Sequence, residues 1–141
     1  MRQGARTLRG VLTGNEVRQL VVDDGIFTNG LRITYFTVWQ EDFAAVASAY
    51  GLLSTRDTVV PPGMMPANDP AAFAWAAQVI TAGLDTITTW HEIDPDHVVN
   101  EELFIHNRAN TVMNYLIVAE PYQMTEDEGV LQLVKNKQQD V

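Results

Sequence analysis

The chain contains no cysteine among its 141 residues. Disulfide cross-links, thiolate nucleophiles and cysteine-ligated zinc are therefore excluded. Lysine is almost absent as well, because only Lys135 and Lys137 occur, both close to the C-terminal end. A phosphate-binding loop of the Walker type needs a lysine directly after a glycine-rich turn, and neither lysine has that setting.

Charged residues are few and mostly acidic. They make up 19% of the chain, and 18 acidic against 9 basic residues give a formal net charge of −9. Binding to nucleic acid requires a basic face that neutralises phosphates, so we expect no direct nucleic-acid binding. A low charged fraction in a small domain also indicates that neighbouring subunits cover part of the surface.

A long hydrophobic segment is missing too. The ~20 consecutive apolar residues that span a bilayer do not occur. The first residues, Met-Arg-Gln-Gly-Ala-Arg, do not form the apolar centre of a secretory signal. We expect no transmembrane span, and a protein that acts where it is made or leaves the cell by lysis or assembly.

The patterns that are present are those of β-strands separated by turns. Asp23-Asp24-Gly25 and Thr28-Asn29-Gly30 are turn signals, and Asn-Gly is favoured in type I′ hairpins. Several short strands with turns between them predict a mainly β protein, one antiparallel β-sandwich domain over residues 1–141. Apolar, β-branched and aromatic residues indicate strands over residues 6–13, 17–22, 31–40, 85–93, 97–107 and 111–124.

The middle of the chain is ambiguous. Residues 41–55 are rich in alanine, which favours helix, although they lie between strands. Residues 70–84 start with the Asp-Pro pair typical of a helix start, yet their larger side chains alternate as in a half-buried strand, and we prefer strand. Val59–Pro70 holds four prolines and a glycine, which predicts a loop that serves as a binding surface or contact arm.

The end of the chain switches to a helical period. Thr125 and Glu128 form a T-x-x-E capping box, and Val130, Leu131 and Val134 recur at helical spacing. We predict a C-terminal helix and tail over 125–141, packed against a sheet edge or docked on a partner. At the other end, residues 1–8 are predicted to form a flexible N-terminal arm.

All three histidines of the chain lie in "WHEIDPDHVVNEELFIHN", residues 90–107. If the strands flanking Asp94-Pro95-Asp96 form a hairpin, His91 and His97 come together and can chelate an ion with one of the two aspartates. No spacing signature of a zinc enzyme or a calcium loop is present. Because Asp-Pro-Asp is typical of turns, we prefer a turn at a corner of the sandwich, with no metal and no cofactor.

No catalytic constellation is apparent, so we expect no enzymatic activity. A G-x-S-x-G elbow is missing, and neither Ser48 nor Ser54 has a histidine nearby in the sequence. Trp39, Trp75 and Trp90 could line a sugar-binding platform if exposed, but at strand spacing tryptophans are more often in the core. A metal- or carbohydrate-binding sandwich that uses the corner between the first two histidines is the alternative hypothesis.

Three stretches of the chain have a characteristic order of strands and turns. They are RGVLTGNEVRQLVVDDGIFTNGLRITYFTVW (Arg9–Trp39), IDPDHVVNEELFI (Ile93–Ile105) and NYLIVAEPYQMTEDEGVLQLVKN (Asn114–Asn136). Together they resemble small β-rich virion structural proteins of marine bacteriophages. The resemblance covers most of the chain, and Phe43–Leu84 departs from the pattern. It implies a non-enzymatic minor capsid or capsid/tail-associated protein with a jelly-roll-like sandwich, located in the virion after synthesis in the host cytoplasm.

The expected partners are further copies of the chain and other virion proteins. A basic arm on an acidic body suits an acidic neighbour, and methionines at the centre of a loop adapt to irregular pockets. Apolar helix residues suit a partner surface. The candidate contact residues are Arg2, Arg6 and Arg9 in the arm, Met64 and Met65 in the loop, and Leu131 and Val134 in the helix.

Overall fold

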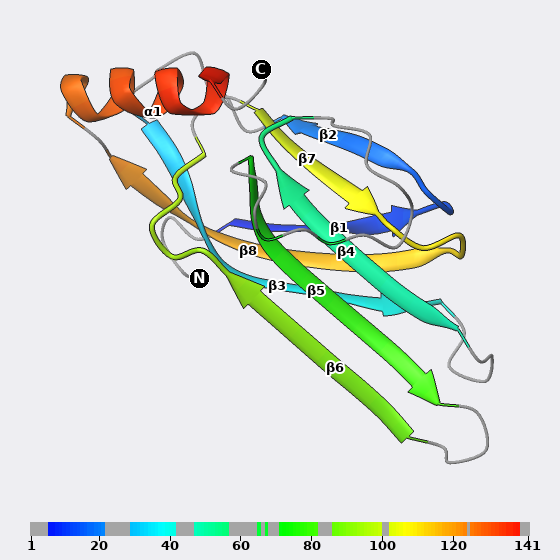
Figure 1. The fold of residues 1–141 in the computed structure, drawn as a ribbon. Helices are drawn as coiled ribbons and strands as arrows, with labels where there is room; N and C mark the ends of the chain where they lie inside the picture. Colours follow the sequence, from blue (N-terminus) through cyan, green and yellow to red (C-terminus); the bar gives the residue numbers. More distant parts are fainter. Residues whose placement is uncertain are drawn as a thin grey trace.

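The computed structural model describes residues 6–21, 29–41, 47–56, 65, 67, 71–81, 86–99, 102–123 and 125–138. In this part of the chain, strands are followed by one helix near the C-terminus (Figure 1). The elements are β1 (Arg6–Leu12), β2 (Val17–Val21), β3 (Asn29–Gln40), β4 (Ser48–Ser54), β5 (Ala72–Thr81), β6 (Thr86–Ile93), β7 (Glu102–Asn107), β8 (Met113–Gln123) and α1 (Glu126–Gln138).

The strands form two antiparallel sheets that pack face to face. One sheet has three strands in the order β1-β8-β3, and the other has five in the order β2-β7-β4-β5-β6. The side chains between them form one hydrophobic cluster drawn from both sheets. The predicted mainly β fold, an antiparallel sandwich with a short C-terminal helix, is confirmed.

The strands pair from the ends of the chain inward. β1 pairs with β8, β2 with β7, and β4 with β5. These are three of the four nested pairs of an eight-stranded jelly roll. The fourth, β3 with β6, is replaced, because β6 forms its hydrogen bonds with β5 instead. The resulting sheets are unequal, and β6 is the last strand of the larger one (Figure 1).

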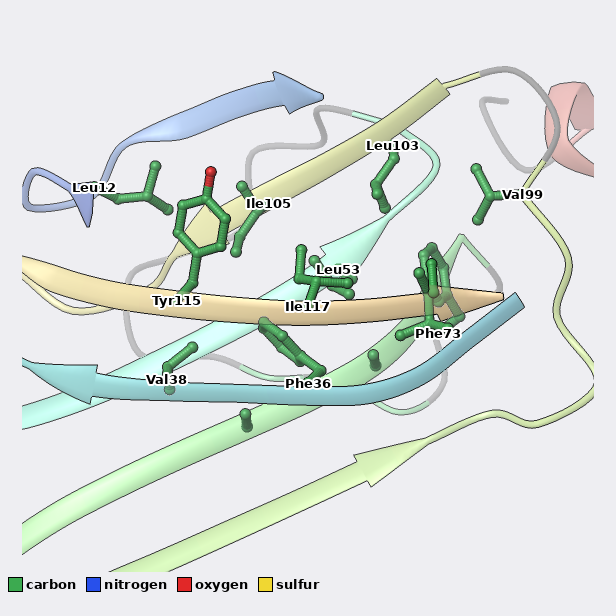
Figure 2. Packing of buried hydrophobic residues seen from close by; sticks show 14 of the residues in the cluster. Leu12, Phe36, Val38, Leu53, Phe73, Val99, Leu103, Ile105, Tyr115 and Ile117 are labelled. Carbon is green, nitrogen blue, oxygen red and sulfur yellow. The ribbon is translucent and has the colours of Figure 1, made fainter. Parts of the chain in front are cut away.

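The core lies between the sheets and follows the two-residue alternation of the strands. In β8 the odd-numbered residues from Met113 to Ala119 are buried, while the residues between them are half-buried. Phe36, Ile117, Leu53 and Ile105 come from both sheets and point into the same space (Figure 2). Alternation with one face buried fixes the strand register, since a slip by one residue would turn the apolar side chains outward.

The alanine-rich middle of the chain is strand. β4 and β5 pair with each other, which settles the ambiguity of the 41–55 region for Ser48–Ser54 and confirms the preference for strand in 70–84. Small residues on the inner face, such as Ala49 and Gly51, allow the facing strand β3 to approach closely. A Cβ atom on Gly51 would lie 2.5 Å from Val38 Cγ1. Alanine and glycine therefore serve sheet packing here and not helix formation.

Three predicted boundaries were wrong. Asn29 and Gly30 do not form a turn; they open β3 and pair with Gln123 and Tyr122 of β8. β2 and β3 lie in different sheets, so no hairpin joins them. The strand predicted over 97–107 starts only at Glu102, after Val99 has bridged to β3.

The predicted arm over 1–8 does not include residues 6–8. Residues 6–8 are already part of β1, where Arg6, Thr7 and Leu8 pair with β8. Residues 1–5 lie outside the described residues, as does most of the predicted loop over Val59–Pro70. The prediction of an N-terminal arm therefore rests on these first five residues alone.

The C-terminal helix begins at the predicted cap. The Glu128 N–H donates to Thr125 Oγ1 at 3.2 Å, and Glu126, Asp127 and Glu128 place negative charge in the first turn. Both features stabilise a helix N-terminus, by satisfying a free N–H and by interacting with the helix dipole. The predicted helix is confirmed over Glu126–Gln138.

Candidate functional site

The corner after β6 is a turn built by Asp94. Its N–H donates to the Phe73 carbonyl oxygen at 2.8 Å, which ends the ladder between β5 and β6. Its Oδ1 then accepts from the Asp96 N–H at 3.0 Å, and its carbonyl oxygen accepts from the His97 N–H at 3.4 Å. An aspartate that binds the backbone two residues ahead forms an Asx turn. The turn predicted for Asp-Pro-Asp is confirmed.

The chain crosses from one sheet to the other directly after this turn. Val99 forms two backbone hydrogen bonds with Leu31 of β3, at 2.7 and 2.8 Å. Leu31 is also paired with Pro121 of β8, so Val99 joins the open side of the three-stranded sheet. The segment is thus a corner of the sandwich, as predicted. It is not a hairpin: β6 pairs with β5, whereas β7 pairs with β2 and β4.

His91 and His97 have different surroundings. His97 is buried, and its ring stacks on Phe73 with a centroid distance of 4.4 Å and an angle of 8° between the planes. His91 is exposed on β6, where its ring meets the edge of Tyr35 at 5.5 Å. One histidine therefore packs in the core and the other lies on the surface.

The four candidate metal ligands are not assembled into a site. Within the residues that the structure describes, no group of three histidine, aspartate or glutamate side chains is placed to hold a metal ion. Asp96 is exposed and Asp94 is partly buried in its own turn. The chelation hypothesis required a hairpin that brought His91 and His97 together, and that hairpin does not form.

A serine–histidine pair that the sequence did not reveal lies on β4 and β7. Ser54 Oγ and His106 Nε2 are 2.7 Å apart, although the two residues are 52 positions apart in the chain. The β4–β7 pairing brings them together, because Leu52 faces His106 and Ser54 faces Phe104 on neighbouring strands. No local motif marks such a pair, since it depends on which strands become neighbours.

The geometry of this pair is that of a structural contact. The Ser54 hydroxyl donates its one proton to the Arg56 carbonyl oxygen, so it accepts from His106 Nε2–H. A nucleophilic serine needs the reverse, with histidine accepting the hydroxyl proton. Both residues are also buried, with Ser54 2% and His106 1% exposed. We therefore assign a structural role to Ser54 and His106, because their contact stabilises the pairing of β4 with β7.

The predicted contact residues of the arm and the loop are only partly described. Arg6 and Arg9 are exposed on β1, at one edge of the three-stranded sheet. Met65 is half-buried, while Arg2 and Met64 lie outside the described residues. Arg6 and Arg9 are therefore accessible on the surface, and their role as contact residues stays a prediction.

Three apolar side chains of α1 are largely in solvent. Leu131 is 68% exposed, Val130 49% and Val134 46%. The helix projects beside one end of the sandwich (Figure 1). The expectation that this helix packs on the sheet edge is therefore not met by these three residues, and docking on a partner remains the prediction for Leu131 and Val134.

Two further exposed apolar side chains lie on β6, on opposite faces of the strand. Ile87 is 50% and Trp90 48% exposed, whereas Trp39 and Trp75 are half-buried. The expectation that the tryptophans are core residues is wrong for Trp90. Trp90 lies on the last strand of the five-stranded sheet, and among the described residues no further strand lies beside it on the outer side.

Comparisons with protein-family models, with curated proteins and with solved structures find no match for this chain. Over the part of the chain that the structure describes, no helix has the length and apolar character needed to cross a membrane.

Proposed function

We propose that this protein is a non-enzymatic structural protein of a bacteriophage particle. It is built into the virion by self-association or by binding capsid or tail proteins. The observation that carries the proposal is the apolar side chain area that α1 and β6 leave in solvent. The phage context comes from the resemblance of Arg9–Trp39, Ile93–Ile105 and Asn114–Asn136 to small virion proteins.

The exposed apolar residues support an assembly function for a physical reason. Scattered apolar residues are ordinary on protein surfaces, but neighbouring ones on a single element mark an interaction site. Val130, Leu131 and Val134 lie within five consecutive residues of one helix, and all three are at least 46% exposed. Contact with a neighbouring subunit would remove this area from water and stabilise the assembly.

The fold and the charge are consistent with this proposal. Jelly rolls are among the folds of viral capsid domains, and three of the four nested strand pairs of a jelly roll are present here. The same fold also occurs in lectins, so it supports the proposal without deciding it. The net charge of −9 argues against direct genome binding, which leaves proteins as the partners.

The test is the native mass of the purified protein, measured by light scattering and followed by electron microscopy of the same sample. The proposal predicts a defined oligomer, ring or shell, or incorporation when capsid or tail proteins are added. A protein that remains a monomer of 15.7 kDa, and that is absent from purified particles, would contradict it.

A carbohydrate-binding function is the second candidate, and one observation favours it. Trp90 is 48% exposed beside Ala77, and Ala77 is flanked on its other side by Tyr50, which is half-buried. Exposed aromatic rings in one row can stack against sugar rings. Binding to immobilised polysaccharides that is lost in Trp90→Ala would support this candidate, and no binding would remove it.

A further inference from the structure

The outer edge of β6 offers a row of backbone groups for pairing. β6 is eight residues long and pairs with β5 on one side. In the described part of the chain no strand lies on its other side, where it forms the lower boundary of the sandwich in Figure 1. An edge strand of this kind is a template for another strand.

The residues whose backbone groups face outward can be identified. The hydrogen bond from the Asp94 N–H to the Phe73 carbonyl places the even-numbered residues of β6 against β5. In an antiparallel ladder the residues between them direct their N–H and C=O groups away from the partner. Consistently, Ile80, which faces Ile87, donates its N–H to Ala47 on the far side of β5. The backbone groups that point away from β5 therefore belong to Ile87, Thr89, His91 and Ile93, and none of them has a strand partner in the described residues.

β6 also lacks the arginine that the other edge strands carry. These are Arg6 and Arg9 on β1, Arg18 on β2 and Arg32 on β3. The sequence of β6, TITTWHEI, has one acidic residue, Glu92, and contains no arginine, lysine or proline. Charged side chains, lysine above all, and proline are common means of preventing strand addition. β6 therefore has no basic side chain and no proline to oppose an added strand.

We propose that two copies of the protein pair through β6, antiparallel and across a two-fold axis, to form one continuous sheet. This inference rests on the proposed self-association and specifies the strand through which two copies pair. The two-fold axis passes between Trp90 of one copy and Trp90 of the other. In this register Ile87 faces Ile93 and Thr89 faces His91, so the free backbone groups of all four outward-facing residues find partners.

The side chains of β6 are complementary to themselves in this register. The apolar pair Ile87–Ile93 forms on the inner face, and Trp90 meets Trp90 on the outer face. Thr88 faces Glu92, and Thr89 faces His91, so no two like charges are opposed. Facing apolar, aromatic and polar pairs stabilise a sheet, whereas facing like charges destabilise it.

The neighbouring two-fold registers are less favourable. An axis at Thr89 places Ile87 opposite His91 and leaves Ile93 without a partner. An axis at His91 places the two copies of His91 opposite each other and Trp90 opposite Glu92. A second copy of the chain is therefore a better occupant of this edge than an arbitrary strand, because the sequence of β6 complements itself in one register only. The interface consists of one pair of eight-residue strands, so we expect a weak dimer whose population rises with protein concentration.

Single-cysteine variants test the register, because the native chain contains no cysteine. The Cα atoms of facing residues in a non-hydrogen-bonded pair are about 4.5 Å apart, which a disulfide can bridge. Trp90→Cys should therefore give a cross-linked dimer with oxidised glutathione, which accepts the two electrons and two protons of the paired thiols. Thr88→Cys is the matched control on the same exposed face. Its two copies would lie about 14 Å apart, four residues along the strand, and should not cross-link.

Proline variants test the pairing independently. Thr89→Pro removes an N–H that faces outward, so it leaves the ladder with β5 intact and should raise the dimer dissociation constant at least tenfold. Gln19→Pro is the control on the edge strand β2. The bond from the Asn107 N–H to the Glu16 carbonyl shows that Gln19 also directs its N–H away from its neighbour β7. It should leave dimerisation unchanged, with circular dichroism confirming that both variants fold.

The outcomes separate this inference from the proposed function. Cross-linking of Trp90→Cys but not of Thr88→Cys, with loss of the dimer in Thr89→Pro, supports the β6 pairing. An oligomer that Thr89→Pro does not weaken, or equal cross-linking of both cysteine variants, overturns the pairing and leaves self-association in place. A wild-type protein that is monomeric up to millimolar concentration overturns pairing between copies and removes self-association as the route of assembly.

Discussion

At the scale of single residues, Asn107 connects the two turns at one end of the sandwich. Its Nδ2 donates to the carbonyl oxygens of Thr13 at 2.8 Å and Thr111 at 2.7 Å, and its Oδ1 accepts from the Ala109 N–H at 3.0 Å. Asn107 is completely buried. One buried side chain thus forms hydrogen bonds with backbone groups of both the β1–β2 turn and the β7–β8 turn.

Asn107→Ala should lower the free energy of unfolding by about 2–4 kcal/mol, because three backbone groups of the two turns lose a hydrogen-bond partner at once. Urea denaturation followed by circular dichroism measures this change. Asn110→Ala is the control, since Asn110 is an exposed asparagine in the same turn. Equal stability of the two variants would show that Asn107 does not hold the turns together.

Gly51 is required where the two sheets approach each other. A Cβ atom at this position would lie 2.5 Å from Val38 Cγ1 and 2.9 Å from Phe36 Cζ. Gly51→Ala should therefore destabilise the protein by about 1–3 kcal/mol, as overpacking of a core does. The same change in a Val38→Ala background should cost less, because the clashing methyl group is gone. Additive losses in the double variant would contradict this explanation.

The stability of the folded protein depends on pH through Glu16. The Thr13 N–H, at 2.9 Å, and the Arg18 guanidinium, at 2.8 Å, hold the pKa of the Glu16 carboxyl below its ordinary value of 4.5. A carboxylate whose pKa is lower in the folded state stabilises the protein above its unfolded pKa, and this stabilisation is lost as the pH falls through the folded pKa.

Glu16→Gln should therefore be less stable than the native protein at pH 7, and the difference should shrink below pH 4.5. We expect a loss of only about 0.5–1 kcal/mol, since water screens a partly exposed ion pair. Urea denaturation at a series of pH values measures it. Glu41→Gln, at an exposed position outside this turn, is the control. A difference that stays constant with pH would rule out the ionised carboxylate as its cause.

At the scale of elements, local chemistry predicted most strands, and pairing over long distances decided the rest. The β-branched residues of β3 and the capping residues of α1 indicate their own structure, and both predictions are confirmed. Which strands become neighbours is not encoded locally. For that reason the hairpin that the metal hypothesis required does not form, and the pairing of Ser54 with His106 was missed.

The helix α1 should contribute little to folding and more to association. Replacing Leu131 and Val134 together by serine should change the free energy of unfolding by less than ~0.5 kcal/mol, because both side chains are largely in solvent. The same variant should bind less to capsid or tail proteins, as a pull-down with purified components would show. Asp127→Ser is a control at an exposed polar position of the same helix. Unchanged binding would remove α1 from the proposed interface.

At the scale of the whole molecule, the sandwich buries its core, but two of its elements, β6 and α1, leave apolar side chains in solvent. The cluster between the sheets is buried and built from both of them, as Figure 2 shows for Phe36, Leu53 and Ile117. The β6 edge and the apolar side of α1 have no such cover in the described residues. The low content of charged residues predicted that neighbouring subunits cover part of the surface, and this stays a prediction. The strand order adds which sheet edge is open in the described residues.

The central claim is that this chain works as a part of an assembly. The most direct measurement is the mass of the purified protein by light scattering across a wide range of concentrations. We predict a mass that rises from 15.7 kDa, the value for one chain, to a defined multiple of it. A mass of 15.7 kDa at every concentration, unchanged when capsid or tail proteins are added, would contradict the account.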